Sequence, residues 1–164
     1  MVTTTIKGLA ELQAVLNTLP AKLERNIMRA ALRQGANVIM RQARENITAI
    51  DAVDTGIMRK GIRVSTEAKG GTVIAKVRAT GKHAHIANWI EYGVEPHSIK
   101  KGAKAKSGTN PSANPHPGFP AKPFLRPALD TETQAAVIAV GNTIKARLLT
   151  KHGIDTPAIE VEAA

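Results

Sequence analysis

Residues 20–46 read PAKLERNIMRAALRQGANVIMRQAREN and decide the fold of this chain. Mostly apolar or small residues recur there every three or four positions, which is the period of an α-helix. This stripe consists of Leu23, Ile27, Ala31, Gly35, Val38 and Gln42. Pro20 suits the start of a helix, because the first turn leaves its N–H groups unpaired and proline has none. We therefore predict one long amphipathic helix over residues 20–46.

The other positions of this predicted helix carry five arginines: Arg25, Arg29, Arg33, Arg41 and Arg44. The 3.6-residue period spreads them around the solvent side and does not align them in one row. Three interpretations are open, namely an ordinary solvated face, a contact with an acidic neighbouring subunit, or a contact with DNA. We treat the five as candidate residues that face DNA or an acidic partner.

Shorter elements flank the long helix on both sides. Residues 3–6 are β-branched and predict an edge strand, and leucines and a valine at helical spacing predict a first helix from Leu9 to the Leu19-Pro20 pair. Downstream, residues 57–66 and 72–80 are rich in β-formers and are joined by EAKGG, which predicts an antiparallel hairpin. Apolar and polar residues alternate in its second strand, so one face of the hairpin should be covered.

The rest of the chain predicts a short helix, a loop and a final helix. Residues 83–92 have helical spacing and end at Gly93, whereas residues 94–122 are rich in proline, glycine and lysine and predict a long, flexible basic loop. Asp130 or Thr131 is suited to cap a last helix that ends near residue 150. Residues 1–150 then form one domain, and residues 151–164 form a tail. The fold class is α+β: a small antiparallel sheet with a hairpin, packed by a long N-terminal and a C-terminal helix.

Composition limits the classes of function. The 164 residues carry a formal net charge of +10 with a pI near 10.2, which favours polyanions or acidic protein surfaces as partners. Cysteine is absent, which excludes disulfides and thiolate zinc sites. No apolar run reaches the roughly 18 residues of a membrane span, and the N-terminus lacks a signal-peptide pattern, so we expect a chain made in the cytoplasm.

The residue pattern gives little support to catalysis. No phosphate-binding loop is present, and no serine lies in a glycine elbow. His83 and His85 would share one face of an extended strand, and Glu91, His97 or His116 could complete a metal site with them. Scattered histidines in a basic chain are more often surface residues. We therefore predict no enzyme, no catalytic or cofactor-binding residue, no cofactor and no metal.

Four motifs in a fixed order resemble one known family. They are IKGLAEL at residues 6–12 before the Leu-Pro pair, the alanine-rich helix at 29–43, Asp54-Thr-Gly56 before a strand, and Ile90-Glu-Tyr-Gly93 leading to Pro123-Phe-Leu-Arg-Pro-Ala-Leu129. Together they span most of residues 6–130, and in this order they resemble the tail-component proteins of long-tailed bacteriophages, often described as tail-completion or neck proteins. The chain departs from that pattern in its long lysine-rich insertion and in lacking a proline before Thr55.

The resemblance implies a structural role in the virion, as a tail-completion or head-to-tail joining component. Copies would form a ring, a hexamer, at the head-proximal end of the tail and contact other connector and tail proteins, with non-specific contact to duplex DNA in the channel. The family pattern also implies that the Pro-Phe box returns the chain to the sheet. Candidate subunit-interface residues are Trp89, Ile90, Tyr92, Phe124, Leu125, Lys100, Lys101, Lys104 and Lys106. The alternative function, motivated by the charge, is a DNA-binding or DNA-packaging accessory protein.

Overall fold

The computed structural model describes residues 4–19, 21–50, 56–97, 116–156 and 160–163. The elements in chain order are β1 (Thr4–Lys7), α1 (Leu9–Asn17), α2 (Ala21–Ala49), α3 (Ile57–Gly61), β2 (Ile62–Lys69), β3 (Thr72–Ala79), α4 (Ala84–Tyr92), α5 (Leu125–His152) and β4 (Glu160–Ala163). The predicted α+β class is confirmed, and α2 is the long helix that the periodicity of residues 20–46 indicates.

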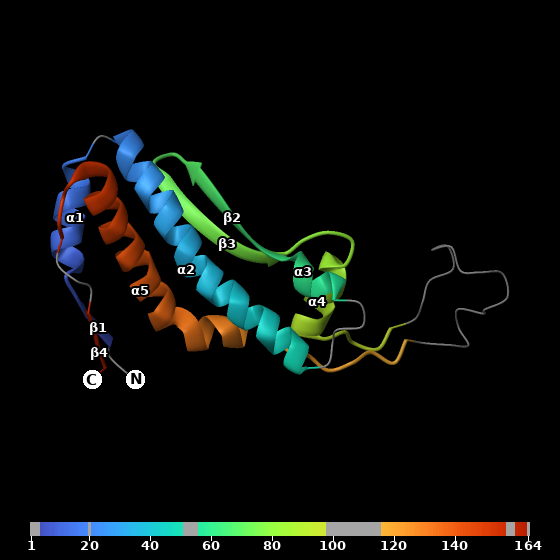
Figure 1. Cartoon of the computed structure of the whole chain (residues 1–164). Coiled ribbons are helices and arrows are strands. Elements are labelled where there is room, and N and C mark those ends of the chain that lie inside the picture. Colours follow the sequence, from blue (N-terminus) through green and yellow to red (C-terminus); the bar gives the residue numbers. More distant parts are fainter. Residues whose placement is uncertain (1–3, 20, 51–55, 98–115, 157–159, 164) are drawn as a thin grey trace.

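Helix α2 lies at the centre of the molecule, with α5 packed along one side and the β2–β3 hairpin along another (Figure 1). The two long helices approach closely at Gly35, where an added Cβ would lie 2.6 Å from Cγ2 of Val140 and 2.9 Å from the carbonyl oxygen of Ala136. A side chain at this position would therefore push the helices apart. The small residue in the predicted stripe is explained by this crossing.

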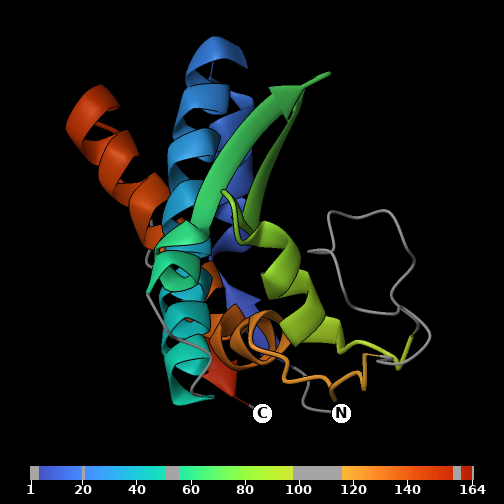
Figure 2. The same ribbon diagram turned by 90° about the vertical axis from the view of Figure 1, so that its right-hand side faces the viewer.

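The hairpin pairs β2 with β3 in antiparallel register, from Ile62 opposite Ala79 to Lys69 opposite Thr72. Gly70 and Gly71 form the two-residue turn, both with positive φ, as the tight hairpin turns of this type require. The turn end projects beyond the helices in the rotated view (Figure 2). The β2 strand thus continues to Lys69, and the predicted five-residue connection from residue 67 to residue 71 is too long.

One predicted strand begins too early. Residues 57–61 are the short helix α3, and strand β2 starts only at Ile62. Gly56 has a positive φ of 68°, and its carbonyl accepts the N–H of Lys60 in a helical turn. Met58 is buried by this turn. Of residues 57–61 only Ile57 is β-branched, and the helical turn buries Met58.

The C-terminal part of the described chain returns to the N-terminal part. Strand β4 pairs with β1 in antiparallel register, from Thr4 opposite Ala163 to Lys7 opposite Glu160. The two chain ends therefore lie side by side (Figure 1). Residues 160–163 lie within the segment predicted as a tail, and this pairing gives them a place in a second two-stranded sheet.

Apolar side chains are buried in two separate clusters, one at each end of α2. The first contains Ala43, Ile47, Met58, Ile62, Ala87, Phe124 and Ala128. The second contains Leu12, Leu16, Ile27, Ala31, Ile144 and Leu148. The first joins α2 to α3, α4, β2 and the start of α5, whereas the second joins only α1, α2 and α5. Within the described ranges no helix is long and apolar enough to cross a membrane.

Candidate assembly site

A buried carboxylate joins two motifs that lie far apart in the sequence. Glu91, near the end of α4, is only 8% exposed. One oxygen, Oε2, accepts the backbone N–H groups of Phe124 and Leu125 at 2.8 and 2.9 Å, and Oε1 accepts that of Arg126 at 3.0 Å. These N–H groups open α5 and have no partner within the helix. The following residue is Pro127, which has no N–H to satisfy.

Glu91 therefore caps α5 from a distance of 33 residues in the sequence. A negative charge at this end also complements the helix dipole. The predicted cap at Asp130 or Thr131 is wrong, because both residues already lie inside α5. The expected return of the Pro-Phe box to the sheet is wrong for the same reason, since Leu125–Leu129 forms the first turn of this helix and no strand.

The backbone of Phe124 is held on both sides. Its N–H donates to Glu91, and its carbonyl oxygen accepts the side-chain N–H of Asn46 at 3.1 Å. The phenyl ring is fully buried in the cluster at the α3 and α4 end of α2. The Glu-Tyr-Gly and Pro-Phe motifs thus meet around one ring.

Backbone pairs continue this junction outward along the chain. The N–H of Lys122 donates to the carbonyl of Ile90 at 2.8 Å, Val94 and Phe119 exchange bonds of 3.0 and 2.9 Å, and His97 and His116 exchange bonds of 3.1 and 2.8 Å. Gly118 has a φ of 73°, and a Cβ there would lie 2.4 Å from the carbonyl oxygen of Val94. The two arms of the predicted loop are therefore paired up to residues 97 and 116. Residues 98–115 lie outside the described part of the chain.

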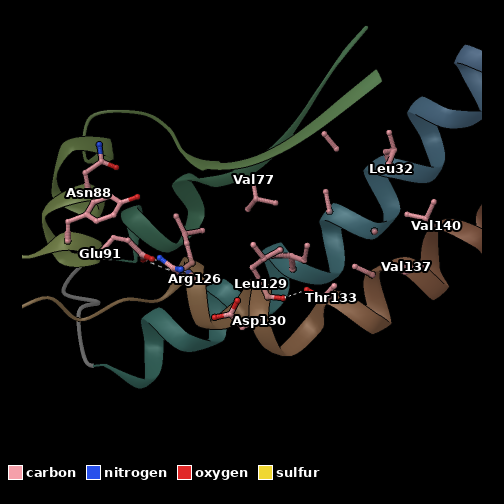
Figure 3. Close-up of a pocket in the computed structure, with 17 residues that line it drawn as sticks. Leu32, Val77, Asn88, Glu91, Arg126, Leu129, Asp130, Thr133, Val137 and Val140 are labelled. Atoms are coloured by element: carbon pink, nitrogen blue, oxygen red, sulfur yellow. Dashed lines mark hydrogen bonds between the residues drawn. The ribbon is translucent and has the colours of Figure 1, made fainter. Parts of the chain in front are cut away.

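A groove of about 730 Å³ opens between α5 and the hairpin, above the middle of α2 (Figure 3). Its floor and walls are mainly apolar. The floor is formed by Leu32, Gly35, Ala36 and Ile39 of α2, one wall by Ala75 and Val77 of β3, and the other by Leu129, Val137 and Val140 of α5. Asn88, Glu91 and Tyr92 of α4 form the end of the groove.

Large side chains of the groove and of α4 face solvent. Tyr92 at the end of the groove is 81% exposed, and Leu129 on the α5 wall is 49% exposed. Trp89, also on α4, is 48% exposed but does not line the groove. The ring of Trp89 meets that of His85 edge to face, with 5.0 Å between the ring centroids. Exposed aromatic residues beside an apolar groove are typical of protein interaction sites.

A family model of bacteriophage HK97 gp10-like tail components matches residues 10–93. The match spans 84 of the 164 residues, from the second residue of α1 to Gly93 at the end of α4. The chain belongs to this family. No curated protein and no solved structure matches it.

The matched HK97 gp10-like segment contains the floor of the groove, its hairpin wall and Glu91, whereas α5 follows beyond it. The segment thus supplies the carboxylate that caps a helix outside its own bounds. The family is one of structural phage tail components and not an enzyme family.

The structure distributes the predicted interface residues over different environments. Trp89 and Tyr92 are exposed, Ile90 and Leu125 are half-buried against the cluster around Phe124, and Phe124 itself is fully buried. The four lysines of the predicted interface, Lys100, Lys101, Lys104 and Lys106, lie outside the described residues.

Four of the five arginines of α2 are exposed: Arg25, Arg29, Arg33 and Arg41. The fifth, Arg44, is half-buried, and its Nη2 donates to the carbonyl oxygen of Ile62 at 2.8 Å. Arg44 therefore holds the start of β2, and a role for it toward an external anion would compete with this bond.

Of the histidines considered for a metal site, the structure brings His97 and His116 together. Within the described ranges, no group of three or more His, Asp or Glu side chains is placed to hold a metal ion. His85 lies on α4 beside Trp89, and His97 stacks on His116 with 5.0 Å between ring centroids. Nδ1 of His116 accepts the backbone N–H of Gly118 at 3.0 Å.

Two features of the site are not predicted by the sequence pattern. The first is the capping of α5 by Glu91. The second is the groove, because its residues come from four elements. The sequence carries one signal for the first feature: α5 begins without a polar capping residue of its own, so its first N–H groups need an acceptor from elsewhere.

Proposed function

We propose that this tail component is a non-enzymatic assembly protein that forms a ring, of six copies, at the head-proximal end of the tail. In that place it completes the tail or joins it to the connector of the filled head. The observation that carries the proposal is the apolar groove with exposed Tyr92 at its end, on a chain that belongs to a phage tail-component family; exposed Trp89 lies on the same helix as Tyr92.

The physical argument rests on exposed apolar surface. A monomer gains about 25 cal/mol for each Å² of apolar surface that it removes from water, so an open groove flanked by aromatic rings favours association. A closed ring needs two different complementary surfaces on each subunit. Trp89 and Tyr92, together with Lys100, Lys101, Lys104 and Lys106, are our candidates for contacts with a neighbour.

Deleting the coding sequence from the phage that carries it tests the role. We expect no infectious particles, with unjoined heads and tails under the electron microscope, and restoration by the chain supplied in trans. Particles that contain none of this polypeptide and remain fully infectious after the deletion would refute the proposal.

Point variants test the surface. We expect the double variant Trp89→Ala and Tyr92→Ala to fold normally but to enter particles poorly, because it lacks two exposed anchors. Leu149→Ala is the matched control, since Leu149 is 49% exposed on α5 but does not line the groove. Equal incorporation of both variants would argue against a role for this surface.

A DNA-binding accessory function is the alternative, and the exposed arginines of α2 favour it. Phosphate contacts lose affinity steeply as salt rises, by roughly 0.9 decades per decade of salt for each contact with duplex DNA. A steep salt slope that disappears in Arg25→Gln, Arg29→Gln and Arg33→Gln would support that function. Weak binding near physiological salt would favour the assembly role.

A further inference from the structure

Residues 56–83 concentrate positive charge on one part of the surface. They include seven cations and one carboxylate, a net charge of +6 out of the +10 of the whole chain. The seven cations are all exposed, and they are Arg59, Lys60, Arg63, Lys69, Lys76, Arg78 and Lys82. This segment comprises α3, the β2–β3 hairpin and the turn before α4. Such a concentration of one sign of charge favours an anionic partner.

The outer hairpin face, which points away from α2, carries four of these cations. They are Arg63 and Lys69 on β2 and Lys76 and Arg78 on β3. Val77 and Ala79 alternate with the cations of β3 and pack against the cluster around Phe124. The inner face of the hairpin is thus covered by the chain itself, whereas the cations of the outer face remain in solvent.

Two arginines of the outer hairpin face lie directly opposite each other. Arg63 is the register partner of Arg78 across the hairpin. Like charges in directly opposing positions destabilise a strand pair. The ion pairs between described residues join Lys76 to Glu67 and Lys145 to Asp155, so neither arginine has a carboxylate partner in that part of the chain. A polyanion bound across both arginines would offset their repulsion.

A second copy of the chain is poorly suited to neutralise this face. Among the described elements, α2, α5 and β4 carry two carboxylates each, and no other element carries more than one. Helices α2 and α5 are themselves net cationic. Strand β4 pairs with β1, which places Lys7 opposite Glu160 in the register. No described element of another copy therefore matches the excess charge of residues 56–83.

Duplex DNA matches both the length and the charge of the outer hairpin face. Arg63 and Lys69 are six residues apart on one strand, which corresponds to about 20 Å of extended chain. A duplex carries one negative charge for every ~1.7 Å of its axis, so this length meets about a dozen phosphate charges. The turn at Gly70 and Gly71 has no side chains and projects beyond the helices (Figure 2), which leaves this end of the face open to a rod-like ligand.

We propose that the outer hairpin face binds the phosphate backbone of duplex DNA through Arg63, Lys69 and Arg78, with Lys76 held beside them by Glu67. This inference rests on the proposed function and adds a partner to it: in the ring, the hairpins face the genome that passes through the tail. It assigns the DNA contact to the hairpin and not to the arginines of α2. Contacts with phosphates carry no sequence information, so we expect no sequence preference.

One isolated copy should bind DNA weakly. Three phosphate contacts give a salt slope of roughly 2.7 decades of affinity per decade of salt, so binding is measurable at low salt and small near physiological salt. Several copies held in one ring act together on one duplex, and their combined binding is stronger than that of one copy. Weak binding by the free chain is therefore compatible with an assembly protein that contacts DNA in the virion.

A salt titration of DNA binding by two charge-matched variants tests the contact. Fluorescence anisotropy of a labelled duplex is measured with the purified full-length chain. The hairpin variant carries Arg63→Gln, Lys69→Gln and Arg78→Gln, and the α2 control carries Arg29→Gln, Arg33→Gln and Arg41→Gln, so both lose three exposed cations. Arg25 is left unchanged because it lines a small hollow together with Gly71 of the hairpin turn.

The two surfaces should respond differently. We expect the salt slope to fall by roughly 2.7 in the hairpin variant and by less than about 1 in the α2 control, since each phosphate contact contributes about 0.9. Equal changes in the two variants, or a larger change in the α2 control, would overturn the proposal. A wild-type chain that binds no duplex at about 50 mM salt would overturn it as well.

Photo-crosslinking gives a measurement that leaves the cations in place. The chain has no cysteine, so Thr72→Cys attaches one photoreactive label beside the hairpin turn, and Thr150→Cys attaches the same label at an exposed position of α5. We expect light to link the first chain to the duplex at low salt and to leave the second unlinked. Equal linkage of the two chains, or no linkage of the Thr72→Cys chain, would contradict the assignment.

Failure of this contact is distinguishable from failure of the proposed function. A phage that stays fully infectious after the deletion refutes the proposed function, whatever the purified chain binds. If the hairpin variant is left out of particles while the wild-type chain binds no duplex, the outer hairpin face binds an acidic protein of the virion. In that case the DNA contact is wrong and the assembly role stands.

Discussion

The two ends of helix α2 bury apolar side chains in different ways. At one end, an aromatic ring, Phe124, is enclosed by helices, a strand and the turn that opens α5. At the other end, aliphatic side chains of α1, α2 and α5 pack helix against helix. The first cluster joins segments that are distant in the sequence and includes a buried carboxylate, whereas the second joins only three helices.

The open groove lies between these two clusters of buried side chains. Of the residues that line it, Ile39, Val77 and Leu125 pack against the first cluster and Val140 packs against the second. Each end of α2 is covered by side chains of the same chain, whereas the middle carries the open groove. Variants of buried side chains should therefore lower stability, and we expect variants of exposed groove residues such as Tyr92 to alter association.

Removal of the aromatic ring should have the largest effect. We expect Phe124→Ala to lower the free energy of unfolding by about 3–5 kcal/mol, because it removes a fully buried ring and leaves a cavity. Chemical unfolding measures the change, and Phe119→Ala is the control, since Phe119 is 38% exposed. Hydrogen exchange should increase in α3 and α4 and not in α1. Equal loss of protection in α1 would show that the two clusters act as one.

Removal of the capping carboxylate should rank next. Glu91→Ala leaves three backbone N–H groups without an acceptor, and we expect a loss of about 2–4 kcal/mol, since charged hydrogen bonds and helix caps each contribute on the order of 1–3 kcal/mol. Glu91→Gln keeps one acceptor oxygen and should cost less. Glu95→Ala is the control, because Glu95 is exposed. Equal stability of the alanine variant and the wild type would contradict the capping role.

A methyl group at the crossing of the long helices should have an intermediate effect. Gly35→Ala gains about 1 kcal/mol of helix propensity, but overpacking commonly costs about 1–3 kcal/mol. Because the new Cβ would meet a backbone oxygen at 2.9 Å, we expect net destabilisation of roughly 1 kcal/mol. Thermal unfolding measures it, with Ala30→Gly as a test of propensity alone. A more stable variant would mean that α2 and α5 separate freely.

The smallest effect should come from the exposed ion pair of the hairpin. The hydrogen bond and the charge of Lys76 lower the pKa of Glu67. A carboxyl group with a lowered pKa stabilises the folded state above its unfolded pKa, near 4.3, and this contribution is lost as the pH falls through the folded pKa. The difference in stability between wild type and Glu67→Gln should therefore be small at pH 7 and vanish at more acidic pH. A difference in the free energy of unfolding between wild type and Glu67→Gln that grows as the pH falls would contradict the lowered pKa of Glu67.

Regular patterns predicted the helices and the hairpin. The stripe from Leu23 to Gln42 predicted α2, and the alternation after Thr72 predicted β3, because both reflect burial of one face within a single element. The start of α5 could not be found in this way, since its cap, Glu91, is contributed by another helix. Residues 57–61 were assigned to a strand from composition, but burial of Met58 favours a helical turn there.

Less of the candidate site than of the fold could be predicted from the sequence. The residue types of Trp89 and Tyr92 predict anchors of a subunit contact, and in the structure both side chains are exposed; their role as anchors stays a prediction. The groove depends on how far apart α5 and β3 lie, which periodicity does not encode. The basic face of the hairpin required the register that sets Arg63 opposite Arg78.

The paired arms that end at His97 and His116 have a practical consequence. These two residues exchange backbone hydrogen bonds, so whatever chain joins them starts and finishes at neighbouring points. Doubling the length of such a connection costs only about 0.6 kcal/mol of closure entropy. The domain is therefore suited to carry a foreign peptide between these histidines, and a virion built with it would display that peptide once for every copy.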